Sequence, residues 1–234
     1  MRWMPALAVI AFAAVAAALG MAWEYAPVAQ ESAGGITQKI FYFHVPSAYV
    51  MYIGVTACVL GSLGYLIQRR PGWDALAQAG AELAVVFATI VLITGPLWAR
   101  KAWGTYWAWD PRLTTTLLGV LIFVAYLVLH SASGAGEAEK RFAAALAVMG
   151  ACVMPVIHYS VQLWRGQHPT VITSRGGGLA PEMGATLAVS FAAFTAMAAV
   201  LLFVRTRVAL QEARVEALRT QAVTLGLLDD EALS

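Results

Sequence analysis

Long apolar runs alternate with short polar stretches along most of this chain. Six such runs occur, at about residues 4–21, 41–67, 76–97, 114–129, 142–163 and 183–204. Most of them approach the ~20 apolar residues that an α-helix needs to cross the ~30 Å hydrocarbon core of a bilayer. The pattern predicts an all-α integral membrane protein with six transmembrane helices and a tryptophan-rich external segment between the third and the fourth.

The end of the chain has a different pattern. After Arg205 the sequence becomes charged and favours helix, and its apolar positions Val208, Val215 and Leu218 recur at helical intervals. We expect a short amphipathic helix here. The chain is therefore predicted to comprise a six-span membrane domain, residues 1–204, and a cytoplasmic amphipathic tail, residues 205–234.

Composition agrees with a membrane protein. Charged residues make up only 12% of the 234 residues, about half their share in an ordinary soluble domain. The net charge of +2 gives no indication of nucleic-acid binding. Cys58 and Cys152 both lie inside apolar runs without CxxC or metal-ligand spacing, so we interpret them as small buried residues. The first apolar run continues to about Trp23 without a convincing cleavage site, and we expect it to be a retained span rather than a signal peptide.

Six spans place both termini on one side of the membrane. Seven basic residues lie close to span ends on that side, against six on the other. Because cytoplasmic connections carry more Lys and Arg, the termini are predicted to be cytoplasmic. The first, third and fifth connections then share the opposite surface, where they bring together His44, the tryptophan-rich segment and His168. His130, at the other end of the fourth span, is excluded from that surface.

The tryptophan-rich segment, residues 98–114, reads WARKAWGTYWAWDPRLT and holds four of the eight tryptophans. Tryptophan near a span end commonly anchors a helix at the membrane interface, but four in one short stretch exceed what anchoring needs. Asp110 and Pro111 also fit the start of the fourth span, with Asp110 as N-cap and Pro111 at the first helical position. The segment is expected to form a flat, partly apolar surface at the membrane edge.

Two histidines beside such a surface suggest a planar ligand that contains a metal, and heme fits. Histidine is a common axial ligand of heme iron, aromatic faces pack against a porphyrin, and arginine binds carboxylates such as the heme propionates. Each feature also has a structural interpretation, since a single interfacial histidine more often makes a structural hydrogen bond. His158 lies about four residues inside the fifth span, or roughly 6 Å below its outer end, and is the alternative to His168.

Three segments carry a resemblance to one known family. WGTYWAWDPRLT resembles the WWD signature of the heme-handling membrane proteins of cytochrome c maturation, and the six spans with the Arg-Leu-Thr ending resemble the CcmC type, heme exporter protein C. FYFHVPSAY is similar to the segment with that family's first external histidine, and HYSVQLWRGQHP to the segment with the second, which matches His168. The resemblance covers about residues 41–169.

The resemblance implies a protein that binds heme b at the periplasmic face of the bacterial inner membrane and delivers it to a membrane-anchored periplasmic heme chaperone of the CcmE type. It implies His44 and His168 as axial ligands, with His158 as fallback. A platform would comprise Trp103, Tyr106, Trp107, Trp109 and Asp110. Arg112 would hold the propionates, with Arg100 and Arg165 as further candidates. The implied partners are ABC-type transporter subunits of the CcmA and CcmB types, a small single-span protein of the CcmD type, and membrane lipid.

Two other classes of protein stay open at this point. A solute permease, or the membrane subunit of an ABC-type transporter, would suit the apolar spans and the intramembrane Glu82, to which we assign no role. An electron-transferring cytochrome b subunit would need histidine pairs inside facing spans. We expect a binding and delivery protein without catalytic residues, while promotion of covalent heme attachment to the chaperone stays open.

Overall fold

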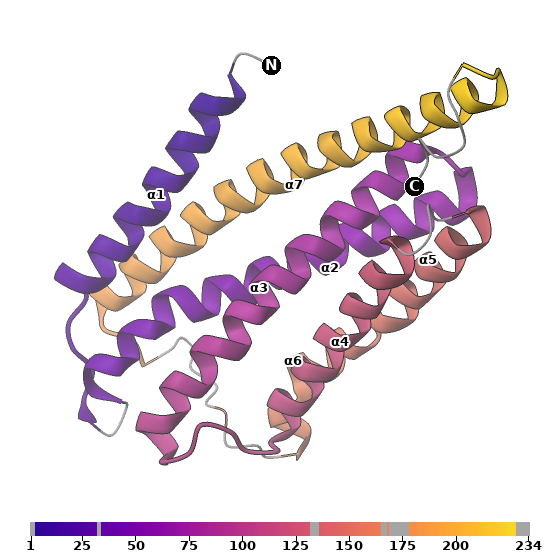
Figure 1. The fold of residues 1–234 in the computed structure, drawn as a ribbon. Coiled ribbons are helices and arrows are strands. Elements are labelled where there is room, and N and C mark those ends of the chain that lie inside the picture. The colour runs from indigo at the N-terminus through magenta and orange to yellow at the C-terminus, as the bar shows by residue number, and fades with distance from the viewer. Residues whose placement is uncertain (1–2, 32–33, 132–135, 165–167, 169–177, 228–234) are drawn as a thin grey trace.

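The computed structural model describes residues 3–31, 34–131, 136–164, 168 and 178–227. Within these ranges the chain is helical without any strand. Six segments are long and apolar enough to cross a membrane, which confirms the predicted class of fold (Figure 1). The helices, in chain order, are α1 (Met4–Glu24), the 3₁₀ helix η2 (Gly35–Ile40), α2 (Phe41–Gln68), α3 (Pro71–Trp103), α4 (Pro111–Ser131), α5 (Glu137–Ala151), α6 (Val153–Trp164) and α7 (Pro181–Thr224).

Several helix boundaries differ from the sequence prediction. The fifth span is interrupted at Cys152, which separates α5 from α6. The sixth span and the predicted tail helix form one continuous helix, α7, so the predicted boundary after residue 204 falls inside it. Pro46 lies beyond the first turn of α2, and η2 leads directly into that helix. A proline at such a position removes one helical hydrogen bond.

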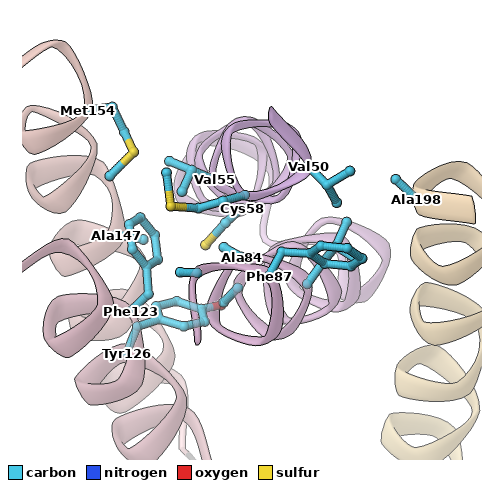
Figure 2. Packing of buried hydrophobic residues seen from close by; sticks show 14 of the residues in the cluster. Val50, Val55, Cys58, Ala84, Phe87, Phe123, Tyr126, Ala147, Met154 and Ala198 are labelled. Atoms are coloured by element: carbon cyan, nitrogen blue, oxygen red, sulfur yellow. The ribbon is translucent and has the colours of Figure 1, made fainter. Parts of the chain in front are cut away.

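The antiparallel pair α2 and α3 forms the centre of the molecule. Glycines allow the two backbones to touch: a Cβ atom on Gly61 would lie 2.4 Å from the Ala77 nitrogen, and one on Gly80 would lie 2.4 Å from the Cys58 nitrogen. In Figure 2 the core side chains of this pair lie between those of α4, α5 and α6 on one side and Ala198 of α7 on the other. Such close contact fixes the start of α2 beside the end of α3.

Charged side chains connect the helices at the end where α2 joins α3. His130 Nε2 of α4 lies 2.8 Å from Asp74 Oδ1 of α3, and Lys140 of α5 lies 3.1 Å from Asp74 Oδ2. Glu82 pairs with Arg205 of α7, whose Nη2 donates to Oε1 over 2.8 Å. Glu82 of α3 thus has a partner on α7. Asp74 holds His130 at the end of α4 that lies away from residues 98–114.

At the opposite end of the bundle, α1, α3 and α6 end while α2, α4 and α7 begin (Figure 1). Lys39 contributes to this end by donating to the Ala22 carbonyl in the last turn of α1, over 2.9 Å, and to the Ala26 carbonyl just beyond that helix, over 3.0 Å. Cations are favourable at a helix C-terminus because its carbonyl groups carry negative partial charge. Lys39 on this surface thus stabilises a helix end, whatever its effect on the orientation of the chain in the membrane.

Candidate functional site

His44 lies near the start of α2 and is buried, with 7% of its surface exposed. Its Nδ1 atom is 2.8 Å from the Thr94 hydroxyl of α3. Its ring meets the ring of Trp98 edge-on, with 6.2 Å between centroids. A Cβ atom added to Gly95 would lie 3.3 Å from His44 Cε1, so the absence of a side chain there lets the imidazole lie against α3. Three residues of one helix therefore fix this histidine.

The tryptophan-rich segment begins inside α3 and leaves it after Trp103. Gly104 adopts a left-handed conformation with φ of 76°, which glycine tolerates better than other residues and which ends the helix. The Arg100 guanidinium donates to the Gly104 carbonyl and lies over the Tyr106 ring, 5.6 Å from its centroid. Arg100, a further propionate candidate, therefore already contacts other residues of the same tryptophan-rich segment.

The aromatic side chains at and after the end of α3 differ in exposure. Trp109 is 77% exposed and Tyr106 is 57% exposed, whereas Trp103 and Trp107 are half-buried. The rings of Trp107 and Trp109 meet edge-on at 5.7 Å. The Thr105 hydroxyl donates to the Trp107 carbonyl over 2.9 Å and so stabilises the turn. The predicted platform aromatics thus lie at the last residue of α3 and in the irregular stretch that follows it, and the rings of Tyr106 and Trp109 are exposed.

Asp110 is buried and forms the N-cap of α4. Its Oδ1 accepts from the Arg112 backbone nitrogen at 2.9 Å and lies 3.4 Å from the Leu113 nitrogen. Its carbonyl accepts from the Thr114 nitrogen, while Pro111 is the first residue of α4. This geometry confirms the predicted capping role. Whether Asp110 also contacts a ligand remains a prediction.

Arg112 joins the start of α4 to the two outer histidines. Its Nη1 lies 3.1 Å from His168 Nδ1, and its Nη2 donates to the His158 backbone carbonyl over 2.9 Å. His158 therefore meets this cluster through its carbonyl, while its ring packs edge-on against Tyr159 at 4.8 Å. His168 also packs edge-on against Trp103, with 6.4 Å between centroids. Arg165, another predicted propionate ligand, lies outside the described residues.

Both candidate ligands contact the last two turns of α3. Trp98 meets His44 and Trp103 meets His168. These tryptophans are five positions apart, which corresponds to about 7.5 Å along a helix axis. The structure therefore brings the two histidines to one end of one helix, from elements that are far apart in sequence.

The residues present fit the chemistry of heme. Two imidazoles, exposed aromatic faces and a guanidinium can serve iron, porphyrin and carboxylates respectively. Within the described part of the chain, the buried Nε1 of Trp98 has no hydrogen-bond partner. The Trp98 indole N–H, which lies beside His44 and has no acceptor there, is suited to donate a hydrogen bond to an oxygen atom of a ligand. Sequence reasoning did not single out Thr94 or Gly95, although Thr94-Gly95-Pro96 interrupts an otherwise apolar stretch, and it placed Trp98 in the tryptophan-rich segment without assigning it to the site.

The fold and the site together define a helical, multi-pass membrane protein with two histidines and a tryptophan-rich segment at one end of the bundle. A family model described as heme exporter protein C, CcmC, matches residues 1–221. The chain therefore belongs to the heme exporter protein C family, as the three sequence motifs suggested.

Relatives named heme exporter protein C agree with this assignment. The protein of Bradyrhizobium diazoefficiens is 38% identical over 144 residues, which cover 62% of this chain and 55% of that protein. The protein of Paracoccus denitrificans is 32% identical over 214 residues, 90% of this chain and 88% of that protein. The Escherichia coli protein is 32% identical over 190 residues, 81% of this chain and 77% of that protein.

Proposed function

We propose that this protein binds heme b at the periplasmic face of the bacterial inner membrane and delivers it to a membrane-anchored periplasmic heme chaperone. Membership of the heme exporter protein C family implies a role in heme export for cytochrome c biogenesis. Family membership also favours this function over a solute permease or a cytochrome b subunit.

One observation carries the proposed site: His44 and His168 contact tryptophans in the last two turns of α3, directly before the exposed aromatic segment. In this proposal the two imidazoles are the axial ligands of the heme iron. Trp103, Tyr106, Trp107, Trp109 and Asp110 form or support the surface on which the porphyrin lies. Heme itself supplies the iron and the vinyl groups through which a chaperone would hold it.

Arg112 is proposed to bind a heme propionate. Its guanidinium already lies beside His168, and the residue is half-buried at the start of α4. A fork of N–H donors matches a carboxylate, and a partly buried ion pair is less weakened by solvent than an exposed one. The open side of the aromatic segment, where Trp109 and Tyr106 are exposed, would remain accessible to an incoming chaperone.

The proposed orientation has cytoplasmic termini and a periplasmic tryptophan-rich segment. Its support is the small excess of basic residues at the ends of the spans on the side of the termini. We further propose that the protein works with a CcmE-type chaperone, with ABC-type transporter subunits of the CcmA and CcmB types, and with a single-span CcmD-type protein, as the family resemblance suggests.

The proposed ligands can be tested on the purified full-length protein by a pyridine hemochrome assay and an absorption spectrum. His44→Ala and His168→Ala are expected to lose heme or to change its spectrum, while His158→Ala is expected to retain both. The His158 ring is exposed and packs edge-on against Tyr159, so its removal is a mild control. Wild-type heme content and spectra in both His44→Ala and His168→Ala would reject the axial assignment. Loss in His158→Ala alone would favour the fallback ligand.

The proposed platform has a separate test. Trp107→Ala is expected to impair transfer of heme to the chaperone even where some heme stays bound, because it removes a half-buried ring that meets Trp109. Transfer is measured as covalent heme on the chaperone after separation on a denaturing gel. Trp23→Ala is a suitable control, since Trp23 lies at the end of α1 and is 65% exposed. Normal transfer by Trp107→Ala would argue against the platform.

A further inference from the structure

The Thr94 side chain has a defined hydrogen-bond direction. Its Oγ1 lies 2.7 Å from the Ile90 carbonyl oxygen, one turn earlier in α3. Only the hydroxyl carries a proton between these two oxygen atoms, so the hydroxyl must be the donor. Since a hydroxyl has a single proton, Thr94 Oγ1 has only acceptor capacity left for a second neighbour.

That second neighbour is His44 Nδ1, 2.8 Å away. Because Thr94 Oγ1 accepts in this contact, Nδ1 must carry the proton. In a neutral imidazole the other nitrogen, Nε2, is then unprotonated and keeps its lone pair. This is the form of histidine that can bind a metal through Nε2 without first losing a proton.

We propose that Thr94 is a positioning residue that holds His44 in the tautomer with Nδ1 protonated and Nε2 available to the iron of heme. This inference rests on the proposed heme-binding function. A hydrogen bond from the second ring nitrogen of a histidine ligand fixes the ring orientation and increases the basicity of the ligating nitrogen. Thr94 would therefore affect the iron without touching it.

The surroundings of His44 strengthen the role of this one hydrogen bond. The ring is buried, packs edge-on against Trp98 and lies close to the Cα of Gly95. Apolar and backbone contacts limit where the ring lies, but they do not decide which nitrogen carries the proton. Thr94 is the residue at the ring whose hydrogen bond makes that choice.

The heme-free protein offers the first test. The chain contains only four histidines, so ¹⁵N-labelled histidine should give a simple ring-nitrogen NMR spectrum of the full chain in detergent micelles. His44→Ala identifies the His44 signals. The wild-type protein should show a protonated Nδ1 and an unprotonated Nε2 at His44, and Thr94→Val, which lacks the acceptor, should show a mixture of tautomers.

Two further variants serve as controls. Thr94→Ser keeps the hydroxyl and should restore the wild-type tautomer. Thr89→Val removes a hydroxyl that makes the same kind of bond, 2.8 Å to the Val85 carbonyl, on an exposed position of the same helix. It should leave the His44 signals unchanged. A wild-type tautomer in Thr94→Val would overturn the inference.

Heme binding offers the second test. Removal of a hydrogen-bond partner of a metal ligand commonly weakens metal binding by about tenfold to a hundredfold. Titration of heme into Thr94→Val should show a loss of about tenfold in affinity together with a changed absorption spectrum, and Thr94→Ser and Thr89→Val should bind like the wild type.

The outcomes separate this inference from the proposed function. If His44→Ala loses heme while Thr94→Val binds it with wild-type affinity and spectrum, only the role of Thr94 is rejected. If His44→Ala retains wild-type heme and spectrum, His44 is not a ligand, and both the axial assignment and the positioning role of Thr94 fail.

Discussion

The two candidate ligands are held in opposite ways. His44 is buried between α2 and α3, and its Nδ1 donates to Thr94. His168 is half-buried, and its Nδ1 lies 3.1 Å from an arginine nitrogen. An arginine has only donors, so Nδ1 of His168 must be the acceptor. The proton of a neutral His168 then lies on Nε2, whereas that of His44 lies on Nδ1.

In the proposed site, the two histidines would therefore not be equally prepared for iron. If a neutral His168 binds through Nδ1, the iron takes the lone pair that Arg112 uses. If it binds through Nε2, the proton moves to Nδ1, which can then no longer accept from Arg112. Ligation by a neutral His168 and the observed contact with Arg112 therefore exclude each other. Heme binding would release Arg112 at the moment when a propionate needs a partner.

The largest expected effect is the difference between the two alanine variants. The His44→Ala substitution should weaken heme binding about tenfold more than the His168→Ala substitution does. The bond from His168 to iron stabilises the complex less, because forming it breaks the contact between His168 and Arg112. A hydrogen bond to a charged group contributes about 1.5–3 kcal/mol, and about 1.4 kcal/mol corresponds to tenfold in affinity. Heme titration of both purified variants measures the ratio. Equal losses of affinity, or a larger loss in His168→Ala, would contradict the inference that His44 is better prepared for iron than His168.

The second prediction concerns Arg112→Gln. Loss of the guanidinium should weaken heme binding by about tenfold, because a propionate loses a charged partner. In the heme-free protein the same change should alter the tautomer of His168 and leave that of His44 unchanged, as ¹⁵N ring spectra would show. Arg112→Lys keeps the charge but lacks the fork that reaches both His168 and the His158 carbonyl. Tighter heme binding by Arg112→Gln would mean that Arg112 only restrains His168.

The sequence was sufficient for the fold and for the surface on which the site lies. Apolar runs of membrane length predicted six spanning helices, and the structure has six segments of that kind. Because successive spans alternate in direction, the order of the spans predicted that His44 and residues 98–114 lie at one end of the bundle. The Asp110-Pro111 pair predicted the start of α4 correctly, because capping depends on neighbours in sequence.

The contacts that distinguish the histidines could not be predicted in the same way. Thr94 lies fifty positions after His44, and they meet only because glycines let α2 and α3 pack closely with a particular rotation. When a helix is apolar on nearly all of its faces, its hydropathy pattern does not indicate how the helix is rotated about its own axis. Arg112 and His168 likewise meet across a connection whose path the sequence pattern does not specify. The available signal was Thr94-Gly95-Pro96, a polar residue and two helix-disturbing residues within a span.

A smaller effect is expected at Asp110. Asp110→Ala should lower the free energy of unfolding by about 1 kcal/mol through loss of the N-cap. It should also impair heme transfer to the chaperone, because the Asp110 carboxylate accepts from the backbone nitrogen of Arg112 and so holds that residue in place. Asp110→Asn keeps a capping oxygen and should restore both properties. Thermal unfolding and the chaperone gel assay measure them. If Asp110→Asn is as stable as the wild type but still fails in transfer, the carboxylate charge itself acts at the site.

The smallest expected effect tests the packing of His44 alone. In Gly95→Ala the new Cβ would meet His44 Cε1 at 3.3 Å, so the ring must move by a few tenths of an ångström. A displacement of that size should weaken heme binding by about threefold, without a change in the tautomer that Thr94 selects. The added methyl also crowds Pro96, because the residue before a proline has restricted freedom. Thermal unfolding of the heme-free protein therefore has to be measured beside heme affinity.

Gly184→Ala is the matched control, since no atom lies within 4 Å of its added Cβ and it also lies in a helix. Equal heme affinities in the two alanine variants would show that the position of the His44 ring is less constrained than its burial indicates. A larger loss in Gly95→Ala, at an unfolding temperature that does not explain it, would mean that α3 sets the position of His44 through Gly95 and its proton through Thr94.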